Sequence, residues 1–261
     1  MTIKNVEITR ESELEMPEEG NLILKASGWN KLLIPLPAQA KFAITGYESQ
    51  VVSFEFGPGD SIQTEPGTLM YATDKISPEM ICSGCWNRCM AGNACCLQRF
   101  TSTGTGYVAL APTFPTAKVV PVFLSSPDVG EKLYCQRGAY MASYGDVSVE
   151  FSVDKNCMRC CCAGMGLVRQ KLKGTGTVFL AALGTIVQKV LQEGEVILCD
   201  QNCVLAFGRN VTLDVKATGG LMGMIGGGEG IYNTKLTGPG LVLIQSVNEL
   251  QFRETMTRKY A

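Results

Sequence analysis

The chain of 261 residues contains no histidine. This absence excludes Ser-His-Asp and Cys-His nucleophilic systems, histidine general bases and every histidine metal site. Lysine, tyrosine and carboxylate chemistry remains open, but no pair of such residues stands out along the chain. The sequence therefore favours a protein that is not an enzyme.

Charged residues are also scarce, at 18% of the chain, and they nearly balance to a net charge of −1. A protein that binds nucleic acid through its phosphates usually carries a basic surface. The composition therefore argues against a nucleic-acid partner. The hydrophobic residues, 46% of the chain, are sufficient for a large core.

Long hydrophobic segments are absent as well. The longest apolar stretch, residues 176–187, is shorter than the roughly 20 residues that span a bilayer. The first twenty residues carry six glutamates and no secretory apolar core, which is the opposite of a mitochondrial transit peptide. We expect a cytoplasmic protein, in which the twelve cysteines are thiols, metal ligands or modification sites rather than a disulfide framework.

What the sequence does contain is an internal repeat. Three markers recur in the same order: a turn with a following acid, a second turn position eight residues later, and a Gly-x-Gly segment that opens an apolar run. The first interval between copies is 70 or 71 residues for each marker, and the second interval is 64. Independent turns would not keep this spacing, so the chain consists of three copies of one unit. The markers are Gly59, Gly130 and Gly194; Gly67, Gly138 and Asn202; and Gly104, Gly174 and Gly238.

The residues inside each unit are typical of short strands. Val147, Val149 and Phe151 alternate with polar residues, which is the period-two pattern of a half-buried strand. No segment between residues 40 and 246 sustains a helical stripe over three turns. The sequence thus predicts an all-β fold with three internal repeats, in a barrel-like stack of antiparallel strands with pseudo-threefold symmetry.

One three-repeat β domain is expected over residues 41–246, with units at about 41–117, 118–185 and 186–246. Residues 1–40 form an N-terminal extension, in which the segment around Trp29 supplies a strand that caps one sheet edge. Residues 247–261 form a C-terminal tail that can be helical.

Four motifs fall in order and in phase with the repeat: EPGTLMY at residues 65–71, GYVALAPTFP at 106–115, GGGEG at 226–230 and TGPG at 237–240. On these motifs the chain resembles the altered-inheritance-of-mitochondria protein 24 family, over most of its length. The resemblance implies a double-stranded β-helix type of fold in three repeats, classed beside the tryptophan RNA-binding attenuator protein. It implies no catalytic residues, and RNA binding does not follow from a shared fold.

Nine of the twelve cysteines lie in two loops, one in each of the first two units. The third unit has a glycine-rich segment, residues 219–230, at the corresponding place. Because the three loops are repeat-equivalent, we expect them around one axis, at one end of the molecule. The cysteines are Cys82, Cys85, Cys89, Cys95 and Cys96 in the first loop, and Cys157, Cys160, Cys161 and Cys162 in the second.

One interpretation of these loops is a metal site. Each loop contains a Cys-x2-Cys pair, the spacing at which two thiolates reach one ion, and two such pairs would complete a closed tetrahedral zinc site. Iron–sulfur ligation is a weaker form of the same hypothesis. A closed site of this kind is structural, because every coordination position is filled. The candidate ligands are Cys82, Cys85, Cys157 and Cys160, with Cys89 and Cys162 as further candidates.

A second interpretation is a membrane contact. Adjacent cysteines suit S-acylation, and stable anchoring needs two or more acyl chains. The third loop would add an apolar face to the same surface. The residues concerned are Cys95, Cys96, Cys161 and Trp86, together with Leu221, Met222, Met224 and Ile225.

The third interpretation is plain packing, or contact between copies in a homo-oligomer. We assign Cys135, Cys199 and Cys203 to core packing. The sequence therefore predicts a non-enzymatic binding or assembly module that acts through its loop face. A structural zinc site, the membrane contact of a peripheral scaffold and self-association all remain open, and an enzyme is the last choice.

Overall fold

The computed structural model describes residues 27, 30–31, 41–82, 96–153, 168–217, 232–247 and 252. Apart from the short 3-10 helix η4 (Gln201–Cys203), its elements are β-strands. Every strand pairing in this part of the chain is antiparallel. The prediction of an all-β fold is confirmed.

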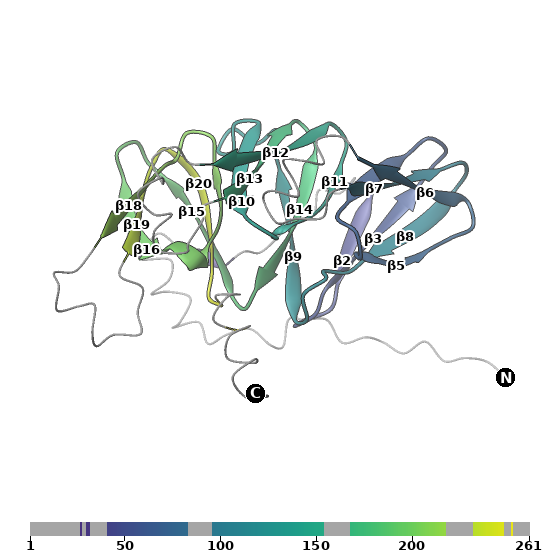
Figure 1. Ribbon diagram of the computed structural model, residues 1–261, viewed down its shortest axis with the longest axis horizontal. Helices are drawn as coiled ribbons and strands as arrows, with labels where there is room; N and C mark the ends of the chain where they lie inside the picture. Colours follow the sequence, from purple (N-terminus) through teal and green to yellow (C-terminus); the bar gives the residue numbers. More distant parts are fainter. Residues whose placement is uncertain are drawn as a thin grey trace.

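The same unit of six strands occurs three times in succession (Figure 1). Unit 1 comprises β3 (Val51–Phe56), β4 (Ser61–Thr64), β5 (Leu69–Ala72), β6 (Ile76–Ile81), β7 (Leu97–Ser102) and β8 (Gly106–Leu110). Unit 2 comprises β9 (Ala117–Phe123), β10 (Lys132–Gln136), β11 (Tyr140–Tyr144), β12 (Val147–Val153), β13 (Val168–Gly174) and β14 (Thr177–Leu183). Unit 3 comprises β15 (Ile186–Leu191), β16 (Val196–Asp200), β17 (Val204–Gly208), β18 (Thr212–Ala217), β19 (Tyr232–Thr237) and β20 (Gly240–Gln245).

Each unit folds into two half-sheets of three strands. The first and third strands of the unit pair with the sixth, and the second and fourth pair with the fifth. Alternation of buried and exposed side chains along β3 and β4 gives each strand one face toward the core. The turns between strands contain glycines with positive φ, such as Gly59 and Gly138, a backbone conformation that costs glycine little.

Successive units are joined by one strand pairing, which we call the unit junction. The second strand of a unit pairs with the third strand of the next unit, so β4 pairs with β11 and β10 pairs with β17. Both junctions have the same register when the repeats are aligned. The paired residues are Thr64 with Ala142, Gln63 with Ser143 and Ile62 with Tyr144 at the first junction, and Cys135 with Ala206, Tyr134 with Phe207 and Leu133 with Gly208 at the second.

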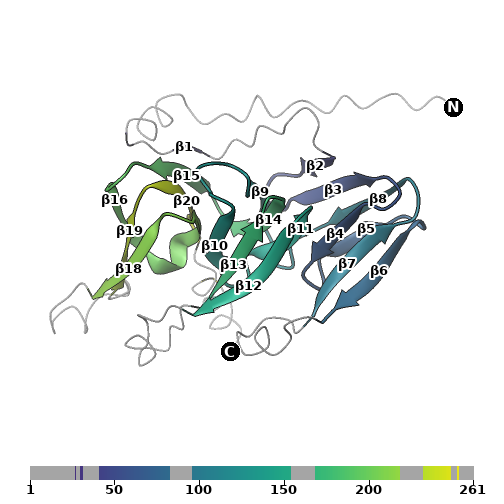
Figure 2. The same ribbon diagram turned by 90° about the horizontal axis from the view of Figure 1, so that it is seen from above.

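The junctions merge half-sheets of neighbouring units into two larger sheets, β6-β7-β4-β11-β14-β9 and β1-β15-β20-β17-β10-β13-β12. One half-sheet at each end has no such neighbour. We call β2-β3-β8-β5 the first end sheet, in which β2 is Phe42–Thr45, and β16-β19-β18 the last end sheet. The units lie in a row rather than around an axis (Figures 1 and 2). A barrel-like arrangement with pseudo-threefold symmetry is not confirmed, because each junction extends a sheet instead of closing it.

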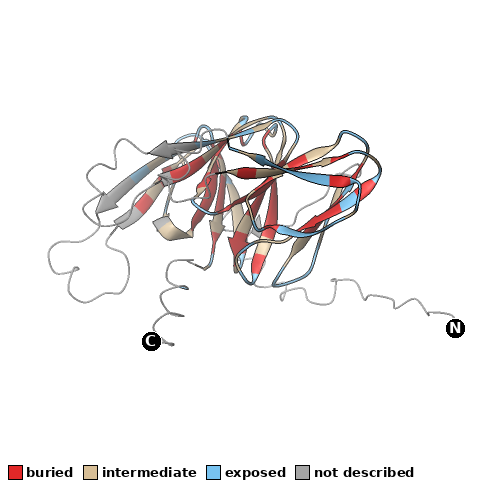
Figure 3. Cartoon of the chain, turned by 45° about the vertical axis from the view of Figure 1, so that its right-hand side comes forward, coloured by how far each residue is buried: buried red, intermediate tan, exposed pale blue. Residues whose placement is uncertain are grey.

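Three hydrophobic clusters fill the spaces between the four sheets, and the buried positions concentrate in the middle of the row (Figure 3). Residues of different units meet in them. The ring of Phe179 in unit 2 packs edge-to-face on Phe54 of unit 1, with 5.1 Å between the ring centroids. Phe42 of β2 contacts the same ring at 4.9 Å. Each unit is therefore completed by its neighbour.

The segments outside the units are described in part. β1 (Asn30–Lys31) lies in the segment predicted to cap a sheet edge, and it pairs with β15. Of residues 248–261, the structure describes Phe252, whose ring lies 5.5 Å from that of Phe114. In the described part of the chain, no helix is long and apolar enough to cross a membrane.

We expect the Phe179→Ala variant to lose about 3–5 kcal/mol of the free energy of unfolding, because the substitution leaves a cavity between units 1 and 2. Phe179 is fully buried, whereas Tyr47 is 53% exposed, so Tyr47→Ala serves as the control and should stay close to the parent protein. Urea unfolding followed by circular dichroism measures both. A Phe179→Ala variant as stable as the control would contradict the proposed coupling of the units.

Candidate functional site

The outermost strands of the two end sheets expose apolar side chains. β5 exposes Leu69, Met70 and Tyr71, and β16 exposes Val196 and Leu198. Within the described residues each strand has a strand neighbour on one side, which is β8 for β5 and β19 for β16. The two strands lie toward opposite ends of the row (Figures 1 and 2). They therefore form two separate apolar edges.

In the inner units, the residues equivalent to those exposed on β5 are buried, and the residue equivalent to Leu198 is less exposed. Met70 and Met141 occupy the same position of the repeat, yet Met70 is 61% exposed and Met141 only 2%. The difference arises from the missing neighbour, because β11 pairs with β4 on its outer edge, whereas the outer edge of β5 has no strand beside it in the described part of the chain. The same contrast separates Leu198, 64% exposed, from the partly buried Tyr134 of β10, whose ring stacks on Phe207 at 5.3 Å.

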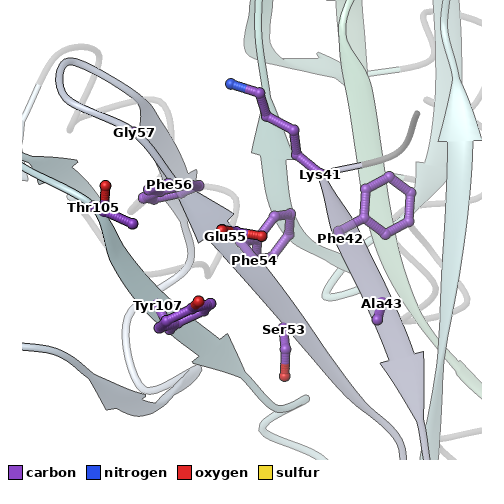
Figure 4. Close-up of a pocket in the computed structure, with 10 residues that line it drawn as sticks. All are labelled: Lys41, Phe42, Ala43, Ser53, Phe54, Glu55, Phe56, Gly57, Thr105 and Tyr107. Atoms are coloured by element: carbon purple, nitrogen blue, oxygen red, sulfur yellow. The ribbon is translucent and has the colours of Figure 1, made fainter.

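A shallow groove of about 620 Å³ crosses β2, β3 and β8 of the first end sheet (Figure 4). Its exposed members, among them Ala43, Glu55 and Tyr107, point away from the core. The corresponding face of unit 2 carries Met141 and Phe179, which are buried against unit 1. The groove thus lies on the face of unit 1 that corresponds to the face of unit 2 covered by unit 1. It is lined by Lys41, Phe42, Ala43, Ser53, Phe54, Glu55, Phe56, Gly57, Thr105 and Tyr107.

A polar cluster lies at the edge of this groove. Lys41 Nζ lies 2.8 Å from Asp60 Oδ2, which also accepts a hydrogen bond from the backbone N–H of Gly57 at 2.8 Å. The Tyr144 hydroxyl donates to Asp60 Oδ1 at 3.2 Å. These bonds hold the pKa of Asp60 below and the pKa of Lys41 above their usual values. Burial, followed by the Asp60 charge, raises the pKa of Tyr144.

The same arrangement recurs in unit 3, where it fixes a turn. Glu195 accepts a hydrogen bond from the backbone N–H of Gln192 at 2.8 Å and pairs with Lys189 at 2.8 Å. Lys189, through its hydrogen bond, lowers the pKa of Glu195. A carboxylate that closes a turn in two units has a structural role, in agreement with the turn chemistry expected for the repeated acid.

Two of the predicted site cysteines form a disulfide. Cys82 and Cys96 follow and precede the paired residues Ile81 and Leu97 of the β6–β7 hairpin, which places them opposite each other with 4.3 Å between their Cα atoms. The expectation that the cysteines remain thiols, ligands or modification sites is wrong for this pair. With both sulfurs in the bond, Cys82 is not available as a zinc thiolate and Cys96 is not available for acylation.

The rest of the predicted loop face lies outside the described residues. This holds for Cys85, Cys89, Cys95 and Trp86, for Cys157, Cys160, Cys161 and Cys162, and for Leu221, Met222, Met224 and Ile225. The hairpins that flank these segments, β6–β7, β12–β13 and β18–β19, extend toward the same side of the row (Figure 2). Their ends are spaced along the row and do not surround one axis. Among the described residues no group of three or more metal-ligating side chains occurs, and the zinc and acylation hypotheses stay predictions.

Core packing, the expected role of the remaining described cysteines, is observed for Cys135, whereas Cys199 and Cys203 are partly buried. Cys135 is fully buried, and burial raises its thiol pKa to about 12. Burial also raises the pKa of Cys199 to about 11 and raises the pKa of Cys203. Because the thiolate is the reactive form, these three sulfurs are poor nucleophiles.

Sequence reasoning missed the apolar edges of β5 and β16. It placed the working surface on the loops, because cysteine clusters are visible in a sequence. The residues of β5 are as apolar as those of the equivalent inner strands, and those of β16 are more apolar, so composition does not show that they are exposed. The alignment of the repeats identifies β5 and β16 as equivalent to the junction strands, but only the open row in the structure shows that their outer edges have no strand beside them in the described part of the chain.

The strand order and the open ends define a repeat-built all-β protein, in which tandem units are joined edge to edge. The chain belongs to the family described as Mitochondrial biogenesis AIM24, whose model matches residues 42–247. The resemblance drawn from the four sequence motifs is thereby confirmed. The placement of this fold beside the tryptophan RNA-binding attenuator protein stays a prediction.

Two proteins of Streptococcus pyogenes are similar to the chain. An uncharacterized protein of serotype M6 is 28% identical over 222 residues, which cover 80% of this chain and 86% of the relative. A Streptococcus pyogenes protein with an X-ray crystal structure superposes with a TM-score of 0.67 at 24% identity, covering 84% of this chain and 98% of the other. At this identity the second likeness shows the fold alone.

We expect Asp60→Asn to lower the melting temperature at pH 7 by roughly 1–3 °C, because an exposed ion pair contributes little. The pKa of Asp60 is lowered in the folded protein, so its stabilisation is complete above the unfolded-state pKa of about 4 and is lost as the pH falls through the folded-state value. The two proteins should therefore melt alike in acid. Asp74→Asn, which alters a more exposed carboxylate, is the control. A deficit that persists at low pH would contradict this account.

Thiol reactivity provides a second test. In native protein at pH 8, Cys135 should react with iodoacetamide about a thousandfold more slowly than an ordinary cysteine, because its raised pKa leaves little thiolate. Cys82 and Cys96 should be labelled only after reduction. Peptide mapping by mass spectrometry distinguishes the sites, and unfolding in denaturant controls for reagent access. Labelling of Cys82 without reductant would contradict the disulfide.

Proposed function

We propose that the protein is a non-enzymatic assembly module that binds further copies of itself through its two end sheets. The observation that carries the proposal is the contrast between repeat-equivalent residues. Met70 and Tyr71 are exposed on β5, whereas Met141 and Ala142 are buried on β11. Another copy of the chain is a partner of suitable chemistry, because the inner units already show how such strands are covered.

The apolar character of the edges supports this function. An exposed strand edge promotes pairing with another chain, and proteins that stay monomeric protect such edges with charges, proline or short strands. Terminal units of open repeat arrays usually carry polar caps. β5 has the sequence LMYA and β16 the sequence VILCD, so neither strand has the composition of a cap. We therefore interpret both edges as contact surfaces.

The polar groups near the groove support a non-enzymatic function. A general base or acid is most effective when its pKa lies near the working pH. The hydrogen bonds of the cluster move Asp60 and Lys41 in the opposite direction, so that both stay charged around neutral pH. Their contacts serve the turn between β3 and β4.

The protein should therefore sediment as a multimer at micromolar concentration, with a mass that is a multiple of 28.1 kDa. Analytical ultracentrifugation over a wide concentration range measures this mass. The measurement is made with and without reductant, so that multimers linked by disulfides are distinguished from non-covalent ones. A single species of 28.1 kDa at every concentration would disprove the proposed function.

A further inference from the structure

We infer that β16 of one copy pairs with β5 of the next copy, antiparallel and in the register of the two unit junctions. This inference rests on the proposed function and specifies its contact. The unit junction always joins the second strand of one unit to the third strand of the following unit. β16 is the second strand of unit 3, and no unit follows it. β5 is the third strand of unit 1, and no unit precedes it among the three.

The two end sheets are the two halves of the sheet that is missing from the row. Each merged sheet joins two types of half-sheet. The first type comes from one unit and is exemplified by β6-β7-β4, and the second type comes from the next unit and is exemplified by β11-β14-β9. The last end sheet, β16-β19-β18, is a half of the first type. The first end sheet, β2-β3-β8-β5, is a half of the second type with β2 added. Their union between two copies completes a third merged sheet.

The register of this contact follows from the repeat alignment. The first two junctions pair Thr64 with Ala142 and Cys135 with Ala206. Because a shift by one residue would turn every side chain to the other face, the register must be kept for the cores to match. The pairs expected between copies are Cys199 with Tyr71, Leu198 with Ala72 and Ile197 with Thr73.

The side chains at this contact suit burial on both faces of the sheet. Residues equivalent to Met70 and Tyr71 face the core of the preceding unit, since Met141 and Ala142 belong to the cluster of unit 1. Leu198 occupies the position of Tyr134, whose ring faces the following unit through Phe207. Each strand thus offers apolar groups to the partner copy. Tyr71 is larger than the alanine that both inner junctions have at this position.

The contact joins different surfaces of two copies. The end sheets lie at opposite ends of the row, so β16 and β5 of one chain do not reach each other in this structure (Figures 1 and 2). A contact between unlike surfaces repeats head to tail, and it produces a ring if the rotation closes or a filament if it does not. A symmetric dimer, in which β5 meets β5, is the alternative that the experiment must distinguish.

Two single variants test the polarity of the contact. Leu198→Lys places a charge on the β16 edge and leaves β5 intact, and Ala72→Lys does the reverse; both residues are exposed, so the fold should be retained. Each variant alone should sediment at 28.1 kDa, and their equimolar mixture should form dimers of twice that mass. Met80→Lys, at a position 54% exposed on β6, is the matched control and should keep the parent's mass.

A third variant tests the register. Leu198→Lys combined with Ala72→Glu places opposite charges on directly paired residues, so multimers should reappear, whereas Leu198→Lys with Ala72→Lys should stay monomeric. If the parent is a multimer and either single variant keeps its mass, or the mixture stays monomeric, the head-to-tail contact is wrong while the assembly function stands. If the parent is monomeric throughout, both fail. Circular dichroism melts confirm that all variants are folded.

Discussion

The pairing between the second strand of one unit and the third strand of the next determines the rest of the structure. A half-sheet of three strands has two free edges, and each unit junction pairs one edge of a half-sheet with its neighbour. The β4·β11 and β10·β17 pairings turn four such halves into two larger sheets and, by doing so, position the facing residues of the three cores. The edge-to-face contact of Phe179 with Phe54 exists because the first junction brings unit 2 over unit 1.

This constraint has a consequence at both ends of the row. Three units contain three half-sheets of each type, but two junctions use only two of each. One half of each type is left over. The outer strand β5 exposes residues whose equivalents are buried in unit 2, and β16 exposes Leu198, whose equivalent Tyr134 is partly buried. Repeat arrays commonly solve this problem with polar terminal units. Here the terminal strands are apolar instead, and this is the basis of the association between chains that we propose.

The three units share one strand arrangement but differ at their hairpins. The β6–β7 hairpin ends in the Cys82–Cys96 disulfide, whereas Cys135 of β10 is buried, Cys199 of β16 is partly buried, and burial raises the pKa of both thiols. The acid after the first turn has the same role in units 1 and 3. Asp60 and Glu195 each accept a hydrogen bond from a backbone N–H and form an ion pair with a lysine. In the described residues, the contacts of Cys82, Cys96, Asp60 and Glu195 stabilise a hairpin and two turns.

The sequence by itself determined the strands, the repeat and the family. Period-two alternation around Val147 and turn glycines such as Gly59 are local properties, and local backbone preference is enough to predict them. The equal spacing of the markers likewise established three units and showed which residues of the units are equivalent. Only the tertiary structure decided that the units form an open row, that Cys82 lies opposite Cys96, and that Met70 is exposed while Met141 is buried. The physical reason is that burial and pairing depend on which strand lies beside a residue. Two identical methionines at the same place in the repeat differ only in that neighbour.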